Sequence, residues 1–129
     1  MIIDTSAVLA ILFDEPDRAS FLQRIAADPD RMISAVNRVE LTFVMEGRKG
    51  EAGRTELENF LFEAEIETAE VTATQAMIAC EAFRRYGKGR HRAALNLGDS
   101  FAYALAKSTG HPLLFKGTDF GATDVTVVA

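Results

Sequence analysis

The first six residues, Met1-Ile2-Ile3-Asp4-Thr5-Ser6, constrain the fold more than any other stretch of the chain. Ile2 and Ile3 are β-branched, which favours a buried strand, and residues 7–13 follow at once with the composition of a helix. A strand that turns directly into a helix predicts a β–α unit, and in open α/β sheets ligands bind beyond the carboxyl ends of the strands. Asp4 occupies that junction and is therefore the first candidate site residue.

Asp4 also has a simpler interpretation as a helix cap. Short oxygen-bearing side chains are favoured at the start of a helix because they accept hydrogen bonds from its free N–H groups. Asp4, Thr5 and Ser6 could each take this role, so this stretch alone leaves capping and function equally open. Other acids at comparable junctions would favour the functional interpretation over simple capping.

The length and composition indicate an ordinary globular protein. We expect a single domain over residues 1–129, which is long enough to bury a substantial core. Hydrophobic residues make up 48% and charged residues 26%, and these fractions argue against wholesale disorder. No apolar run reaches the length of a membrane span, and the N-terminus lacks the features of a signal peptide. We therefore expect a cytoplasmic protein with no membrane partner.

Residue counts exclude several kinds of site. One cysteine and two histidines in unrelated stretches are too few for a closed zinc site. Cys80 lies in the apolar stretch 76–80, where we expect a small buried residue without thiol chemistry. The net charge of −5 argues against a generic basic nucleic-acid-binding protein but is compatible with a local positive patch.

Segments of strand and helix character alternate along the chain. The predicted strands lie at 2–3, 31–34, 66–71, 112–115 and 124–128. The predicted helices lie at 7–13, 17–27, 34–47, 57–64, 72–83 and 101–109. A polar turn at 47–50 joins the third and fourth of these helices into a hairpin. This order predicts an α/β/α sandwich with a mainly parallel central sheet, whose strand order remains open.

Four acidic residues occupy positions from which their side chains can meet at one edge of the sheet. Asp4 and Asp119 follow predicted strands, and Asp99 lies at a helix start, where the helix dipole favours negative charge and Ser100 is the alternative cap. Glu40 lies about two turns inside its helix. Its neighbours at helical spacing are apolar and place it at the border of the buried face: Val36, Val39, Phe43 and Val44.

Gathered carboxylates raise one another's pKa, and a divalent cation with oxygen ligands allows them to remain ionised together. Hard oxygen ligands suit Mg²⁺ or Mn²⁺. Such a metal polarises a scissile phosphate and lowers the pKa of a bound water, and a second ion about 4 Å away can stabilise the leaving oxygen. The acids thus predict phosphodiester hydrolysis. No Ser-His-Asp or Cys-His arrangement competes, because neither His91 nor His111 has an evident nucleophile.

Residues 84–92 form the one dense basic stretch and hold five of the fourteen Lys and Arg residues. A charge run is most often a solvated face. Its position just before Asp99 favours a second interpretation, in which the cations bind an extended polyanion. The candidate substrate-binding cations are Arg84, Arg85, Lys88, Arg90 and Arg92.

Four motifs in order, at residues 1–7, 33–40, 95–104 and 114–120, resemble the PIN-domain ribonucleases and, within them, the VapC-like toxins of bacterial toxin–antitoxin pairs. The resemblance runs nearly end to end and identifies the acidic quartet as Asp4, Glu40, Asp99 and Asp119. It implies that Asp4 and Asp99 are the direct metal ligands and that Thr118 is a small polar residue near the site. Ser100 stands where close relatives often have Cys, a difference without expected effect on the chemistry. Asp124 is a fifth acid, and either it or Asp119 lies closer to the metal.

The resemblance also implies an activity and partners. We expect Mg²⁺-dependent endonuclease activity on RNA, with Mn²⁺ able to substitute, in a homodimer. A co-expressed VapB-like antitoxin is expected to neutralise the toxin by covering the site with its tail. The cations of the basic stretch would then hold RNA phosphates, and Tyr86 would stack on an unpaired base.

Two other classes of function fit parts of the sequence. A catalytically inactive PIN-fold module would keep the fold for protein interaction, but the presence of all four acids argues against it. A phosphoaspartate protein, either a receiver domain or a phosphatase, also places an Asp at a strand end with Mg²⁺. Here Thr5 and Ser6 follow Asp4 with no second Asp nearby, and the basic stretch suits an extended polyanion better than a phosphoaspartate.

Overall fold

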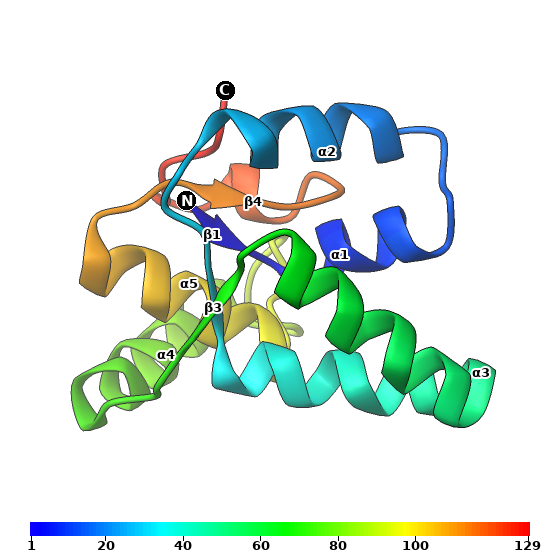
Figure 1. The fold of residues 1–129 in the computed structure, drawn as a ribbon. Coiled ribbons are helices and arrows are strands. Elements are labelled where there is room, and N and C mark those ends of the chain that lie inside the picture. The colour runs from blue at the N-terminus through cyan, green and yellow to red at the C-terminus, as the bar shows by residue number, and fades with distance from the viewer.

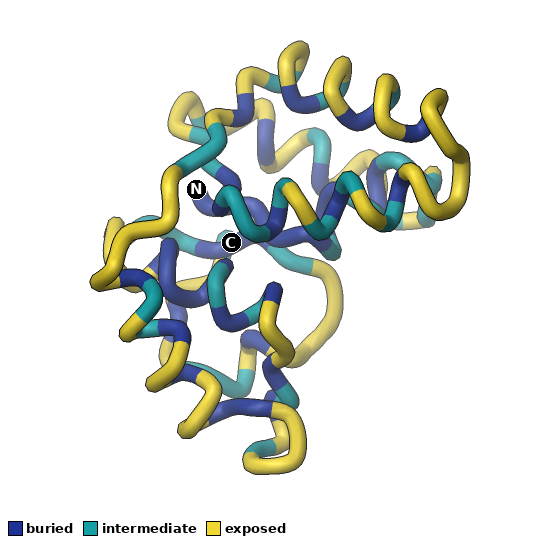
Figure 2. Tube along the Cα trace, turned by 90° about the horizontal axis from the view of Figure 1, so that it is seen from below, coloured by how far each residue is buried: buried dark blue, intermediate teal, exposed yellow.

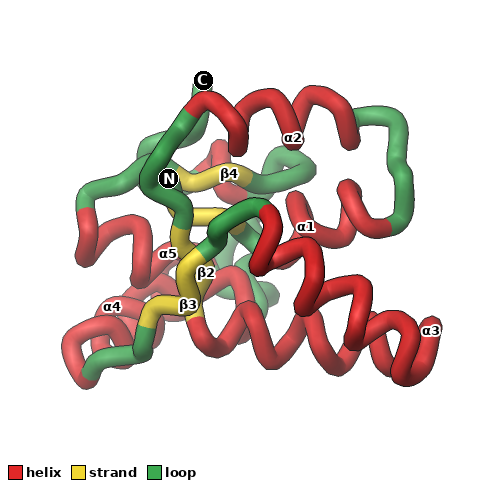
Figure 3. Tube along the Cα trace, viewed as in Figure 1, coloured by secondary structure: helices red, strands yellow, loops and turns green.

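A short parallel sheet forms the centre of the molecule (Figures 1 and 3). The computed structural model describes all residues, 1–129. Its four strands pair in the order β3-β2-β1-β4, and every pair is parallel: β1 (Ile2–Ile3), β2 (Met32–Ser34), β3 (Glu67–Ala69) and β4 (Leu113–Leu114). Ile2 lies opposite Met32 on one side and Leu113 on the other. The parallel arrangement confirms the predicted sheet and brings the carboxyl ends of all four strands to one edge.

Helices cover both faces of the sheet. They are α1 (Thr5–Leu12), α2 (Arg18–Ala27), α3 (Ala35–Glu63), α4 (Ala73–Tyr86) and α5 (Leu97–Thr109), with a short 3₁₀ turn η1 (Phe120–Ala122) near the end. Successive strand residues point to opposite faces, so Ile3 packs with α1, α2 and α3, whereas Ile2 packs with α4 and α5. These two buried clusters are the two interfaces of the predicted α/β/α sandwich.

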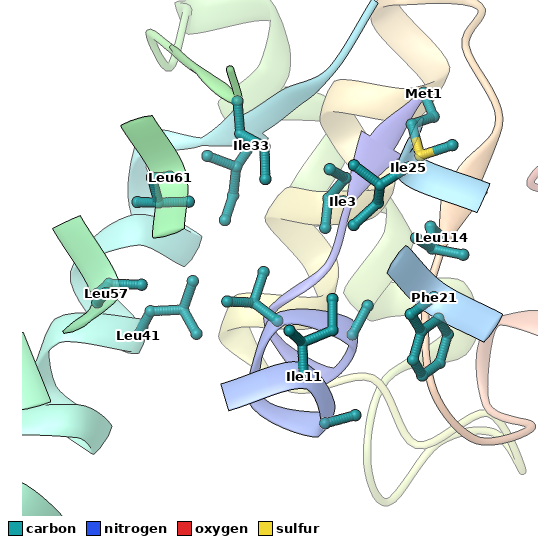
Figure 4. Packing of buried hydrophobic residues seen from close by; sticks show 14 of the residues in the cluster. Met1, Ile3, Ile11, Phe21, Ile25, Ile33, Leu41, Leu57, Leu61 and Leu114 are labelled. Carbon is teal, nitrogen blue, oxygen red and sulfur yellow. The ribbon is translucent and has the colours of Figure 1, made fainter. Parts of the chain in front are cut away.

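The larger cluster joins α1, α2 and α3 to the sheet, and Figure 4 shows its side chains converging from all these elements. Leu41 and Leu57 come from different parts of α3 and are fully buried. Burying one such side chain stabilises a fold by about 1.5–3 kcal/mol. Figure 2 shows the exposed residues along the outer sides of the helices, as expected for amphipathic helices around a sheet.

The predicted helical hairpin at 47–50 is present, but its turn is a single residue. α3 continues to Gly50, whose φ of 61° and ψ of −146° are non-helical, and helical geometry resumes directly after it. Such positive φ favours glycine because a Cβ would be strained there. The two arms of α3, before and after Gly50, lie side by side (Figure 1). An ion pair between Lys49 and Glu56, with 3.1 Å between the charged atoms, joins them. A Cβ on Gly53 would collide with the carbonyl oxygen of Met45, so glycine permits the close approach.

The predicted last strand at 124–128 is wrong. Only one isolated parallel bridge, between Leu113 and Val127, is present there, with Thr126 accepting from the Leu113 N–H at 2.8 Å. β4 has two residues and therefore offers little backbone for a further strand. Asp124, the first residue of this segment, is instead bound by side chains of α5.

The expected burial of Cys80, on α4, is wrong. Met77 is 73% exposed and Cys80 is also exposed, whereas the buried positions include Ala79, Ala82 and Tyr86. α4 packs mainly on α5, through Ala79, Ala82 and Tyr86, so Met77 and Cys80 lie outside that contact. None of the helices combines the length and the apolar character that crossing a membrane requires.

Candidate active site

Asp4 caps a helix and also has a free, buried carboxylate oxygen. It follows β1, is 2% exposed, and caps α1 by accepting the Ser6 N–H at 3.0 Å and the Ser6 hydroxyl at 2.6 Å, both on Oδ2. The other carboxylate oxygen, Oδ1, is buried and has no hydrogen-bond partner. The two interpretations of Asp4 are therefore compatible, because the cap uses one oxygen and leaves the other free.

The electrostatics of the site connect the four acids. Burial raises the pKa of Asp4 to about 6, and the negative charges of Asp99 and Glu40 add to the rise, while the hydrogen bonds from Ser6 oppose it. Burial also raises the pKa of Asp99, and Glu40 and Asp119 add to that rise. Asp4, Glu40 and Asp99 are thus within electrostatic reach of one another, and Asp119 is within reach of Asp99.

Glu40 is half-buried on α3, between α1 and α5. The Thr5 hydroxyl donates to its Oε1 at 2.5 Å. On the α5 side, a Cβ on Gly98 would lie 2.6 Å from Oε1 of Glu40 and closer still to Oε2, so only glycine accommodates the carboxylate. The buried Asn37 donates from Nδ2 to the Gly98 carbonyl at 3.0 Å and holds α5 against α3.

Glu40 borders the buried face of its helix, as predicted, but the buried neighbours differ from those expected. Val39 and Phe43 are exposed, and the buried face of this part of α3 consists of Asn37, Leu41 and Met45. Asn37 was missed as a supporting residue. A polar residue one helical turn before Glu40 was the available signal, but an amide within an apolar face is identified only once its partner on α5 is known.

Asp99 lies in the first turn of α5, because this helix begins about one turn before the start predicted at residue 101. The helix begins at Leu97 with Asn96 as N-cap, and Asp99 and Asn96 form a reciprocal capping box. Ser100 is not the cap, because its hydroxyl donates to the Asn96 carbonyl at 2.7 Å. Asp99, like Asp4, therefore stabilises a helix start, and its carboxylate lies within electrostatic reach of Glu40 and Asp119.

Asp119 and Asp124 were the two alternatives for the acid closer to the metal. Asp119 lies within electrostatic reach of Asp99, whereas Asp124 is bound by other side chains. Asp119 and Thr118 are exposed, in the segment between β4 and η1. Asp124 accepts from the Tyr103 hydroxyl at 2.5 Å and from Lys107 at 3.2 Å, and Arg85 lies 3.8 Å away. These partners hold the pKa of Asp124 below its usual range.

The donor set fits a divalent cation in its chemistry. The side chains do not form a complete metal cage: no group of three or more His, Cys, Asp or Glu side chains is arranged to hold an ion. The buried Oδ1 of Asp4 nevertheless lacks a donor, and the pKa values of Asp4 and Asp99 are both raised, first by burial and then by neighbouring acids. A cation with hard oxygen ligands would relieve both conditions.

The basic stretch forms a closed connection between α4 and α5. A bridge pairs Gly87 with Leu95, and Gly89 has a positive φ of 83°. Arg84 and Arg85 form ion pairs with Glu81 and Asp124, at 3.2 and 3.8 Å. The Arg90 guanidinium lies over the Phe83 ring at 5.5 Å, whereas Lys88 and Arg92 are exposed and form no ion pair.

The structure corrects the role expected for Tyr86. Its ring is 8% exposed, packs edge-on against His91 at 5.1 Å between centroids and lies 5.8 Å from the ring of Tyr103. Its hydroxyl accepts from Arg85 at 2.7 Å. Tyr86 is therefore a core residue of the α4–α5 contact, and its face is not open to a nucleic-acid base.

The chain matches a known protein family and several full-length relatives. The PIN domain family model matches residues 1–125. VapC ribonuclease Mb0640 of Mycobacterium bovis and ribonuclease VapC30 of Mycobacterium tuberculosis are each 50% identical over 129 residues, which is 100% of this chain and 98% of each relative. Ribonuclease VapC of Mycolicibacterium smegmatis is 52% identical over 128 residues, which is 99% of both chains.

Solved structures show the same fold at much lower sequence identity. VapC20 of Mycobacterium tuberculosis, described as a toxin that cleaves the sarcin–ricin loop, superposes with a TM-score of 0.77 at 19% identity over 97% of this chain and 95% of its own. VapBC2 of Rickettsia felis, solved with a DNA fragment from its promoter, superposes with a TM-score of 0.76 at 17% identity. The match covers 99% of this chain and 96% of that chain. From the family match and the full-length relatives we conclude that this chain belongs to the PIN-domain family, among the VapC ribonucleases.

Proposed function

We propose that this protein is a Mg²⁺-dependent endoribonuclease that acts as the toxin of a toxin–antitoxin pair. The observation that carries the proposal is the buried, unpartnered Oδ1 of Asp4, within reach of the charges of Glu40 and Asp99 at the carboxyl edge of the sheet. Membership among the VapC ribonucleases supports the same activity.

Asp4 and Asp99 are the proposed metal ligands. When bound, Mg²⁺ would polarise the scissile phosphate and lower the pKa of a water molecule, so that hydroxide forms near neutral pH. Ser6 and Asn96 fix the carboxylates of Asp4 and Asp99 through hydrogen bonds. Glu40, held by Thr5, and the exposed Asp119 complete the acidic set and would orient water by accepting its protons in hydrogen bonds.

The substrate-binding proposal separates the five cations of the basic stretch. Lys88, Arg90 and Arg92 are free of ion pairs with acids and would bind RNA phosphates on the approach to the site. Arg84 and Arg85 already have carboxylate partners and would contribute less. The exposed Thr118 beside Asp119 would add a hydroxyl to the substrate side of the site.

We also propose a VapB-like antitoxin as the partner of a homodimeric toxin that acts in the cytoplasm. The Rickettsia felis neighbour is a VapBC assembly, which supports a partner of this kind. An Arg-bearing tail would pair bidentately with the acidic site and displace the cation. The expected result is arrested growth when this chain is expressed alone and normal growth when the antitoxin gene is co-expressed. Normal growth with abundant, folded, metal-binding protein and no partner would contradict the toxin role.

The direct test uses protein purified free of antitoxin. Incubation with total cellular RNA and Mg²⁺ should give discrete cleavage ends that EDTA abolishes, and Asp99→Asn should give none. Equal cleavage in EDTA, or wild-type cleavage by Asp99→Asn, would refute the metal mechanism. Mn²⁺ titration by calorimetry gives a second readout, in which wild type binds and Asp99→Asn binds weakly.

The alternatives make different predictions in the same assays. An inactive interaction module would bind its partner without cleaving RNA under any metal condition. A phosphoaspartate protein would acquire a phosphoryl group from acetyl phosphate in the presence of Mg²⁺, detectable by mass spectrometry. We expect no such modification on Asp4, since the basic stretch suits a polymeric substrate.

A further inference from the structure

The two hydroxyl residues that follow Asp4 bind two different acid-bearing segments. Thr5 and Ser6 are the first two residues of α1 and lie directly after the carboxyl end of β1. Each makes a side-chain hydrogen bond to a part of the chain that is remote in sequence. Their partners are Glu40 on α3 and the backbone of Lys116 after β4.

Ser6 connects Asp4 to the segment that carries Thr118 and Asp119. Its hydroxyl donates to Oδ2 of Asp4 at 2.6 Å and accepts the Lys116 N–H at 2.9 Å. Both hydrogen-bonding functions of a hydroxyl are used, which fixes its direction. Because Oδ2 also accepts the Ser6 N–H, the carboxylate of Asp4 is held with Oδ1 as its free oxygen.

Thr5 performs the corresponding task for Glu40. It is 8% exposed, and its hydroxyl donates to Oε1 of Glu40 at 2.5 Å. Gly98 closes the opposite side of the same carboxylate. Glu40 is therefore held between α1 and α5 at a defined position relative to Asp4.

We propose that Thr5 and Ser6 are positioning residues that join three segments of the site, β1 with Asp4, α3 with Glu40 and the post-β4 segment with Asp119. Capping does not account for these contacts. The cap of α1 consists of Asp4 and the Ser6 N–H, which any residue at position 6 would supply. The Ser6 hydroxyl instead accepts the Lys116 N–H, which has no other hydrogen-bond acceptor within the protein. The proposal rests on the metal-dependent activity proposed above and adds the residues that assemble its site.

Hydrogen exchange of the Lys116 amide distinguishes the two hydroxyls. Ser6→Ala removes the acceptor of this amide and should speed its exchange about fivefold, the factor expected for one lost hydrogen bond. Thr5→Val keeps the shape of the side chain and should leave this exchange rate unchanged. Both variants should lower Mn²⁺ affinity by about tenfold, because each loosens a carboxylate of the site.

Rescue and control variants separate positioning from general stability. Ser6→Thr and Thr5→Ser retain the hydroxyl and should restore Mn²⁺ affinity, and Ser6→Thr should restore the slow exchange of Lys116. Ser108→Ala removes an exposed hydroxyl that bonds only the Leu105 carbonyl, and should change neither quantity. In cleavage assays, Ser6→Ala should lower kcat with little change in KM, since no RNA contact is removed.

The outcomes for the two proposals are distinguishable. Wild-type Lys116 exchange or wild-type Mn²⁺ affinity in Ser6→Ala overturns the role of Ser6, and wild-type Mn²⁺ affinity in Thr5→Val overturns the role of Thr5. Failure of the wild-type protein to cleave any RNA, with both binding effects present, overturns the proposed ribonuclease activity and leaves the positioning role supported.

Discussion

Asp99 and Asn96 cap each other at the start of α5: Oδ2 of Asp99 accepts the Asn96 N–H at 3.0 Å, and Oδ1 of Asn96 accepts the Asp99 N–H at 2.9 Å. This exchange satisfies two N–H groups that would otherwise lack partners in the first turn. It also fixes the carboxylate of Asp99 without using both of its oxygens. A proposed metal ligand thus belongs to the local structure that starts its helix.

Asp99→Asn should abolish Mg²⁺-dependent cleavage while preserving the fold. The amide oxygen can still accept the Asn96 N–H, and the loss of one negative charge relieves repulsion from Glu40 and Asp119. We expect the melting temperature in EDTA to stay level or rise, and Asp4→Asn should behave alike. Asp14→Asn, which changes an exposed acid outside the site, is the matched control and should keep wild-type cleavage. A large fall in melting temperature for Asp99→Asn would contradict this account.

The metal-free protein should lose stability as the pH rises from about 4 to 7, owing to Asp4. Its pKa rises from 3.8 in the unfolded chain to about 6 in the fold, so the fold favours the neutral acid. That stabilisation is complete below the unfolded pKa and is lost as the pH rises through the folded value, at a total cost of about 3 kcal/mol. Urea unfolding in EDTA should show the wild type falling relative to Asp4→Asn across this range. A difference independent of pH would exclude Asp4 as the cause.

Gly98→Ala should displace Glu40 and the start of α5. The added Cβ has no room beside the Glu40 carboxylate, and overpacking of this kind costs about 1–3 kcal/mol. We expect a lower melting temperature and loss of cleavage. Gly47→Ala is the control, because nothing lies near its Cβ position within α3, and there alanine should stabilise the helix by about 1 kcal/mol. Equal effects of the two substitutions would refute the steric role of Gly98.

Asp124→Asn should lower stability without affecting the metal. Asp124 is held by Tyr103 and Lys107, and its lowered pKa means that its ionised form stabilises the fold. Asp119→Asn should do the reverse, lowering Mn²⁺ affinity with little change in melting temperature. Tyr103→Phe provides an independent check and should destabilise by about 1 kcal/mol with Mn²⁺ binding intact. If Asp124→Asn weakened Mn²⁺ binding and Asp119→Asn did not, Asp124 rather than Asp119 would belong to the metal site.

Replacing Lys88, Arg90 and Arg92 together by alanine should weaken RNA binding and flatten its salt dependence. Each lost phosphate contact should reduce the log–log slope by roughly 0.7 for single-stranded RNA. Mn²⁺ affinity in the absence of RNA should not change, because no carboxylate is altered. The control replaces three cations near the turn of α3, Arg48, Lys49 and Arg54, and should keep the wild-type slope. An unchanged slope in the variant without Lys88, Arg90 and Arg92 would indicate that the basic stretch is only a solvated connection between helices.

The sequence determined the parts of this protein that depend on local physics. The β-branched start, the short oxygen-bearing residues at helix starts and the alternation of strand and helix segments predicted the element order and the parallel sheet. The four acids were singled out as candidates because each follows a predicted strand, lies at a helix start or borders a buried helical face. Gly110 adopts the left-handed conformation at the end of α5, which follows the local rule that glycine is favoured just past a helix C-terminus.

Tertiary structure decided which of several similar residues carries each role. Asp119 and Asp124 are comparable in sequence, yet only Asp124 meets Tyr103 across the fold. Tyr86 and Cys80 were assigned the wrong exposure, because burial on α4 depends on how closely α5 approaches. The bonds from Thr5 to Glu40 and from Ser6 to Lys116 span 35 and 110 residues, and no periodicity or capping rule reaches that far. Local patterns specify elements, whereas contacts between remote segments arise only when those elements pack.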